Sequence, residues 1–93
     1  MSERIRTHPG ANLKDCLEAE GWSVNEFADR LEISRATASR LLNGRQGISP
    51  EVALALERIG WSNAEFWMRR QASYDLSVAR NRAEGGAREY DDV

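Results

Sequence analysis

Residues 23–44 read SVNEFADRLEISRATASRLLNG, and this stretch decides the fold. Apolar residues recur in it at helical spacing in two short segments, 24–31 and 35–43, which are separated by only about three residues. The side chains expected to face inward are Phe27, Ala28 and Leu31 in the first segment, Ile33 in the turn, and Ala38, Leu41 and Leu42 in the second. Because Ala28 and Ala38 are small, the pattern predicts two short helices that cross closely over a shared apolar wedge.

Glycines divide the rest of the chain into further helices. Gly21, Gly44 and Gly60 each follow an apolar-periodic segment, where a left-handed residue commonly ends a helix. We therefore predict helices from residue 9 or 12 to 20, over 24–31, 35–43 and 50–59, and from 63 to about 80. A chain of 93 residues with 41% hydrophobic content suits a single all-α domain of five helices.

One short motif occurs twice and marks two helix starts. Residues 21–27, GWSVNEF, recur at 60–66 as GWSNAEF. In each copy we predict that the serine is the N-cap, that the glutamate completes a capping box, and that the tryptophan packs on the phenylalanine at the fourth helical position. Ser49, Pro50 and Glu51 form a third start signal, with a capping serine, proline in the first turn and an acid near the helix N-terminus.

The outward face of the second short helix carries side chains that suit a DNA major groove. It holds arginines, which can reach guanine O6 and N7, and small residues, which can touch a thymine methyl or a phosphate. The whole chain has a net charge of −2, yet residues 33–50 contain three arginines and no acid. We therefore predict a sequence-specific contact with double-stranded DNA, in which phosphates supply most of the affinity.

The same stretch resembles the helix-turn-helix of the phage-repressor-like (Xre/Cro) family over about residues 13–60, through Phe27-Ala28, Ile33-Ser34 and Leu41-Leu42-Asn43-Gly44. The resemblance implies a five-helix lambda-repressor-like domain that presents its third helix to the major groove. The residues that it places at DNA are Ser34, Arg35, Ala36, Thr37, Ser39 and Arg40, with Asn25 and Arg45 beside the backbone. Two positions depart from the family pattern: Val24 replaces a phosphate-bracing glutamine, and Glu32 replaces the glycine of the turn, where it should strain the backbone.

The flanks are similar to those of HigA-type antitoxins. His8-Pro9-Gly10 precedes the first helix, and Ala64-Glu65-Phe66-Trp67 opens the fifth, followed by residues 71–76, QASYDL. This resemblance implies an antitoxin that neutralises a small RelE/HigB-like, mRNA-cleaving toxin and represses its own operon by binding a palindromic operator as a dimer. The alternative is a stand-alone or phage-type repressor without a toxin partner.

The fifth segment carries apolar residues on two faces, one with Met68, Ala72, Leu76 and Ala79, the other with Trp67, Tyr74 and Val78. We assign the first face to the core and predict that Trp67, Tyr74 and Val78 form a homodimer interface. The alternative is that the domain covers both faces itself. By this division, residues 1–8 are a flexible N-terminal arm, 9–80 the helix-turn-helix domain with its dimerisation helix, and 81–93 a disordered acidic tail.

Several classes of protein are excluded by what the sequence lacks. His8 and Cys16 occur singly, so we expect no metal, no cofactor and no disulfide. No catalytic constellation or phosphate-binding glycine loop is present, so we expect no enzyme. The longest apolar run, residues 52–56, is far too short to cross a membrane, which predicts a soluble, cytoplasmic protein.

Overall fold

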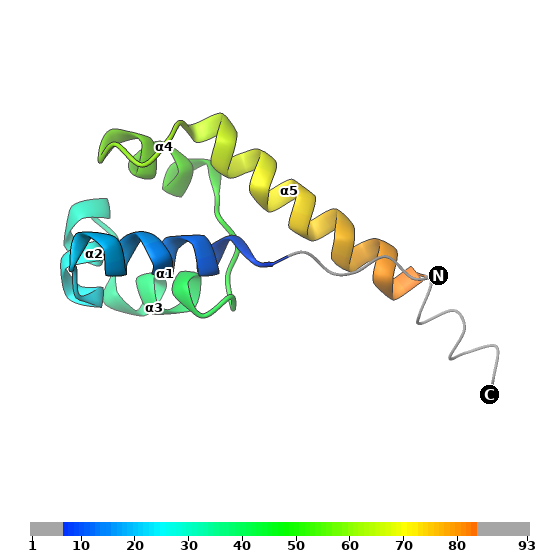
Figure 1. The fold of residues 1–93 in the computed structure, drawn as a ribbon, viewed down its shortest axis with the longest axis horizontal. Helices are drawn as coiled ribbons and strands as arrows, with labels where there is room; N and C mark the ends of the chain where they lie inside the picture. The colour runs from blue at the N-terminus through cyan, green and yellow to red at the C-terminus, as the bar shows by residue number, and fades with distance from the viewer. Residues whose placement is uncertain (1–6, 84–93) are drawn as a thin grey trace.

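The structure is a computed structural model and describes residues 7–83. These residues form five helices and no strand, which confirms the predicted all-α fold (Figure 1). The helices are α1 (Pro9–Glu20), α2 (Val24–Leu31), α3 (Arg35–Leu42), α4 (Pro50–Arg58) and α5 (Ala64–Asn81). Their bounds agree with the predicted ones within a residue or two, the usual uncertainty at helix ends.

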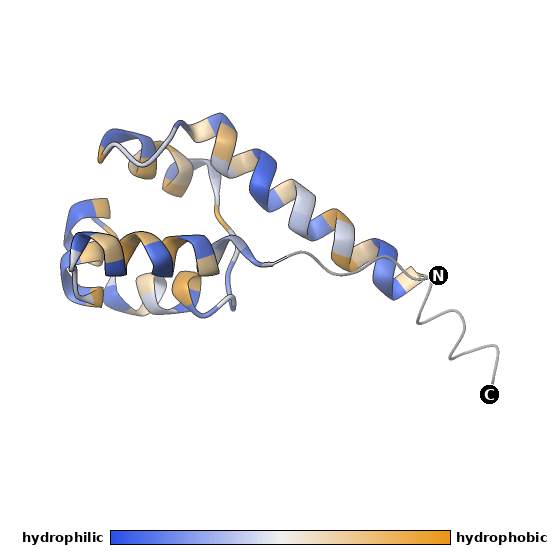
Figure 2. Cartoon of the chain, viewed as in Figure 1, coloured by the Kyte–Doolittle hydropathy of each residue, from blue (hydrophilic) through white to orange (hydrophobic). Residues whose placement is uncertain are grey.

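Helices α1, α2 and α3 lie together as one group, and α4 lies above them in Figure 1. Helix α5 is the longest and packs against both α4 and α1, so it ties the ends of the domain together. Beyond those contacts α5 extends away from the body of the molecule (Figure 1). Figure 2 shows that every helix mixes apolar and hydrophilic residues, as expected of helices with one face in a core and one in water.

The core lies where the five helices meet. Phe27, Leu13, Leu41 and Leu56 have no exposed surface. The core is completed by Leu17, Ala28, Leu31, Ala38, Leu42, Ile48, Val52, Ala53, Ala55, Trp61 and Trp67. Helices α2 and α3 therefore bury the residues that their spacing predicts to face inward.

The repeated motif begins α2 as predicted but begins α5 differently. At α2, the Glu26 amide donates to Ser23 Oγ over 3.1 Å, and the Ser23 amide donates to Glu26 Oε1 over 2.9 Å, which is a complete capping box. At α5, the N-cap is Asn63, whose Oδ1 accepts the Phe66 amide at 2.7 Å. The predicted cap at Ser62 is therefore wrong. Ser62 has φ 61°, a left-handed conformation that leaves capping to the next residue.

The tryptophans of the two copies meet each other rather than pair within their own motifs. Trp61 stacks on the rings of both Trp22 and Phe27, with centroid distances of 5.1 and 5.7 Å. The guanidinium of Arg30 lies 4.4 Å from the centre of the Trp22 ring on the same stack. Residues 39 positions apart thus form one aromatic cluster between α2 and the start of α5.

Helix α5 presents a different face to the core than predicted. Trp67 is 2% exposed and donates its indole N–H to the Trp61 carbonyl, so its assignment to a dimer interface is wrong. Leu76, assigned to the core, is 49% exposed, and Ala72 is also exposed. The bulky indole takes the inward position because it buries more apolar surface than an alanine can. Tyr74, like Val78, is half-buried.

The two ends of the domain also differ from the predicted division. His8, assigned to the arm, is the N-cap of α1: its Nδ1 accepts the Gly10 amide at 2.8 Å. Its ring packs edge-on against Tyr74, with centroids 4.7 Å apart. Helix α5 continues through Asn81. The remainder of the predicted arm, residues 1–6, and of the predicted tail, residues 84–93, lie outside the described residues.

Candidate nucleic-acid interface

Helix α3 begins at a cap that also belongs to the predicted DNA-reading face. Ser34 Oγ accepts the Thr37 amide at 3.0 Å and lies 2.9 Å from Thr37 Oγ1. The two hydroxyls are therefore bonded to each other, and the Ser34 hydroxyl is also bonded to the helix backbone. Ser34 thus fixes the start of α3 as well as lining its exposed face.

The turn before α3 contains the strained residue that the sequence predicts. Glu32 has φ 59°, and its backbone lies in the left-handed region without the freedom of glycine. The turn is held because the Ile33 amide donates to the Ala28 carbonyl at 3.0 Å. A Glu32–Arg58 ion pair at 3.7 Å is largely exposed to solvent and adds little.

Helices α1 and α2 pack against the back of α3. Ala28 and Ala38 are 3% and 0% exposed at the α2–α3 crossing, which confirms the predicted close approach. Helix α1 reaches the other end of α3, where Gly10 lies against the Leu41 carbonyl. Gly44 ends the segment with φ 73°, a conformation that favours glycine. Helix α3 is therefore fixed at its start, its middle and its end.

The predicted DNA-reading residues share one accessible side of α3. Arg35, Ala36 and Arg40 are exposed, and Thr37 and Ser39 are half-buried beside them. Within residues 7–83 the Arg35 side chain makes no hydrogen bond or ion pair, so its guanidinium is available to a base or phosphate. This set combines charged donors, hydroxyls and a methyl group, the groups that read base edges.

Arg40 has a partner that the sequence analysis missed. Its Nε donates to Gln46 Oε1 at 2.9 Å, and its Nη2 donates to Thr37 Oγ1 at 3.3 Å. Gln46 lies in the segment between α3 and α4 and stands outside the periodic pattern of either helix. No sequence signal marks it, because the pairing depends on how the chain turns after Gly44.

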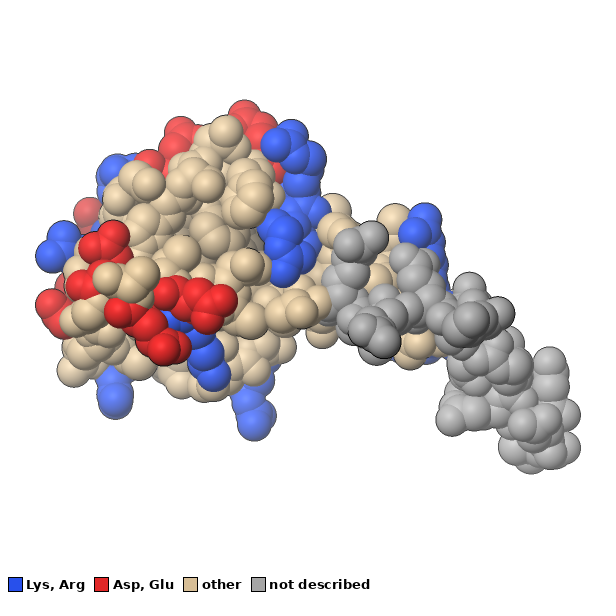
Figure 3. Space-filling view, viewed as in Figure 1, with Lys and Arg blue, Asp and Glu red and all other residues tan. Residues whose placement is uncertain are grey.

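Two further residues, Asn25 and Arg45, are those predicted to lie beside the DNA backbone. Asn25 is exposed in the first turn of α2, and Arg45 is exposed directly after α3. The Arg45 amide donates to the Arg40 carbonyl at 2.9 Å, which ties this residue to the helix end. In Figure 3, acids gather over α1, and basic side chains project from the lower edge, where Figure 1 places α3. The molecule therefore offers a basic edge beneath an acidic face.

Two titratable groups lie away from this face. Burial lowers the pKa of His8, with Asp75 acting to raise it and Arg70 to lower it. Burial also raises the pKa of the Cys16 thiol, and the carboxylates of Asp15 and Glu20 act in the same direction. Cys16 is therefore a protonated thiol at neutral pH, without the activation a nucleophile needs.

Among residues 7–83, no three His, Cys, Asp or Glu side chains are grouped so as to hold a metal ion. None of the helices in this range is both long and apolar enough to cross a membrane.

The chain matches the family model described as "Helix-turn-helix" over residues 13–59. It is 41% identical to virulence-associated protein A′ of Dichelobacter nodosus, over 75% of this chain and 62% of that protein. It is 35% identical to the HTH-type transcriptional regulator YddM of Escherichia coli K12, over 76% of each. The chain therefore belongs to the helix-turn-helix family of DNA-binding regulators.

The solved structures that this chain resembles include antitoxins of the HigA family. The Pseudomonas aeruginosa antitoxin HigA, solved with the higBA promoter, superposes with a TM-score of 0.79 at 31% identity, over 97% of this chain and 96% of that one. An addiction module antidote protein of the HigA family from Coxiella burnetii gives 0.75 at 28%, over 100% and 97%. Within its family, this chain has the fold of the HigA antitoxins.

Proposed function

We propose that this protein is a cytoplasmic antitoxin that neutralises a RelE/HigB-like, mRNA-cleaving toxin and represses its own operon by binding a palindromic operator as a dimer. The accessible face of α3 is the observation that carries the DNA-binding part. Its arginines and hydroxyls project from a helix whose back is packed against α1 and α2. The antitoxin part rests on likeness along nearly the whole chain to HigA, which was solved with its promoter.

The operator contact divides into reading and positioning residues. Arg35, Thr37, Ser39 and Arg40 supply most of the discrimination between bases, with Ser34 and Ala36 beside them. Asn25 and Arg45 lie against the sugar-phosphate backbone on either side. Three arginines within residues 33–50 give a steep dependence of affinity on salt, despite the net charge of −2.

The dimer forms along α5. Tyr74 and Val78 share one face of the helix and are half-buried, so both retain surface for a second copy. A two-fold dimer places two α3 helices about one DNA turn apart on a palindrome.

The test is co-expression with the small open reading frame beside the gene, followed by affinity capture and a shift assay on the upstream DNA. Capture of a small basic protein, rescue of growth and a shifted promoter are the expected results. Arg35→Ala is the matched variant, because it should weaken the DNA shift while capture and rescue persist. A shifted promoter with no captured partner and no rescue would establish the stand-alone repressor instead.

A further inference from the structure

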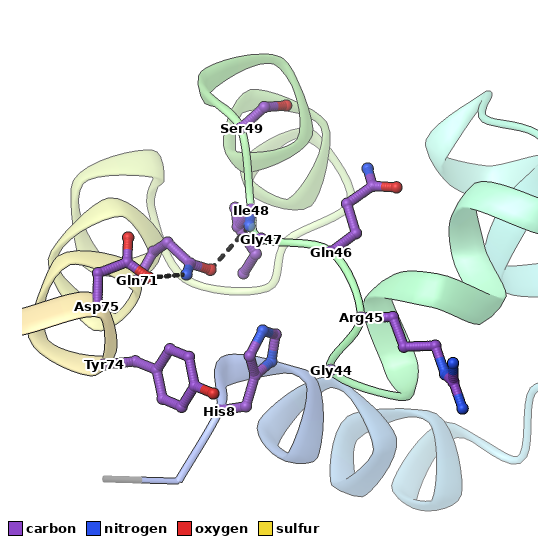
Figure 4. A pocket seen from close by; sticks show the side chains of 10 residues that line it. All are labelled: His8, Gly44, Arg45, Gln46, Gly47, Ile48, Ser49, Gln71, Tyr74 and Asp75. Atoms are coloured by element: carbon purple, nitrogen blue, oxygen red, sulfur yellow. Dashed lines mark hydrogen bonds between the residues drawn. The ribbon is translucent and has the colours of Figure 1, made fainter. Parts of the chain in front are cut away.

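A buried glutamine on α5 is hydrogen-bonded to the segment that follows α3. Gln71 is 8% exposed, and its Oε1 accepts the Ile48 amide at 2.8 Å. Its Nε2 donates to Asp75 Oδ1 at 2.8 Å, which fixes the orientation of the amide group (Figure 4). A buried polar side chain with both ends bonded is costly to rearrange, so this contact defines where Ile48 lies.

The segment between α3 and α4 is held at both ends. At its start, the Arg45 amide donates to the Arg40 carbonyl at 2.9 Å. At its end, Ile48 is held by Gln71 and is itself 3% exposed. Between them, a Cβ on Gly47 would lie 3.1 Å from the Gln71 amide group, so the backbone at Gly47 packs tightly against that side chain. Figure 4 shows this segment between Gln71 on one side and the end of α3 on the other.

The middle of that segment contacts the DNA-reading face. Gln46 Oε1 accepts Arg40 Nε at 2.9 Å, and the same guanidinium donates to Thr37 Oγ1 at 3.3 Å. A displacement of the segment would therefore move the acceptor that orients Arg40. Gln71 is 25 positions beyond Gln46 in the sequence, yet along the segment only Gly47 separates Gln46 from Ile48, the residue that Gln71 holds.

We propose that Gln71 is a positioning residue for DNA recognition: from α5 it fixes the segment between α3 and α4, and through Gln46 it orients Arg40 on the reading face. The inference rests on the proposed DNA-binding function. It also makes α5 the element through which an event at the dimer surface reaches the DNA contacts, because Gln71 and Tyr74 belong to the same helix.

The first test is a double-mutant cycle on operator affinity. Gln71→Met keeps the side-chain length and removes both hydrogen bonds, and Gln46→Ala removes the acceptor for Arg40. If Gln71 acts through Gln46, the double variant should bind the operator about as weakly as the weaker-binding single variant. Its fold-loss in affinity should then be at least about threefold smaller than the product of the two single fold-losses. Gln71→Met with Arg35→Ala is the control pair, and there the losses should multiply.

Losses that multiply in both cycles would overturn the proposal and leave Gln71 with a local structural role. The proposal would also be overturned if the fold-loss of the double variant fell equally far below the product of the single losses in both cycles, because that result would indicate general loosening of the domain. A wild-type protein that shifts no upstream DNA fragment would instead contradict the proposed function. The coupling between Gln71 and Arg40 is then tested by a measurement that needs no DNA.

That second test is ¹⁵N NMR on the free protein. In Gln71→Met, the Arg40 Nε–H resonance should move and the Ile48 amide should lose protection from hydrogen exchange, while the Arg35 Nε–H resonance stays in place. Unchanged Arg40 and Ile48 signals would overturn the proposal. The rescue is Gln71→Glu with Asp75→Asn, which keeps an acceptor for Ile48 and reverses the second hydrogen bond. It should restore both signals and operator affinity, whereas Gln71→Glu alone places two carboxylates together and should not.

Discussion

Gly10→Ala should destabilise this protein, although the same change in most helices stabilises. Gly10 lies in the first turn of α1, and replacing a helical glycine by alanine ordinarily gains about 0.5–1 kcal/mol. Here an added Cβ would lie 2.2 Å from the Leu41 carbonyl oxygen and 3.2 Å from that of Leu42. Both are backbone atoms at the end of α3, so relief requires the two helices to separate. Overpacking of this kind costs about 1–3 kcal/mol, which leaves a net loss of about 1–2 kcal/mol.

The measurement is equilibrium urea unfolding followed by tryptophan fluorescence, where the loss should lower the midpoint by about 1 M. Ala11→Gly is the matched control in the same turn, and it should lose about 0.5–1 kcal/mol through helix propensity alone. Gly10→Ala should also weaken operator binding, because the end of α3 moves. A variant as stable as the wild type, or more so, would refute the close approach of α1 to α3.

Four further predictions follow from the described geometry. Phe27→Ala should cost about 3–5 kcal/mol in urea unfolding, because the ring is 0% exposed; a loss below 1 kcal/mol would contradict its place in the core. Glu32→Gly should stabilise by about 1 kcal/mol because φ is 59°, and a destabilised variant would show that the turn is unstrained. Arg35→Ala should cost about 1–3 kcal/mol of operator affinity, concentrated at one base pair in a base-by-base binding scan; equal losses on all sequences would make it a phosphate contact. Burial lowers the pKa of His8, so the unfolded chain binds the proton more tightly, and the contribution of His8 to the unfolding free energy should be constant above about pH 6.5 and fall below it; His8→Asn, which keeps a capping oxygen, should remove this histidine's share of the fall.

The accessible face of α3 could be predicted from the sequence, but the network behind it could not. The pattern around Arg35 and Arg40 is local, because residues three or four apart on a helix share a face. Gln46 and Gln71 show no such pattern. Their bonds join residues 6 and 23 positions apart, and they exist because the segment after Gly44 passes against α5.

Local signals also determined where the helices begin and end, because a cap depends on atoms within four residues of each other. Ser23 and Ser49 accept the amides that their positions predict, and Gly21 takes the left-handed conformation that ends α1. Even the strain at Glu32 could be expected from the chain alone.

Only the tertiary structure decided how α5 is rotated and which aromatic rings meet. Apolar residues occupy two faces of α5, so periodicity does not show which face is buried. Trp61 decides between them, because it packs on Trp22 and Phe27 of a distant segment and its carbonyl accepts the Trp67 indole N–H. Once Trp67 is buried there, Leu76 turns toward solvent. The rotation of a helix about its own axis is set by the partners it packs against, and those partners are fixed only when the chain has folded.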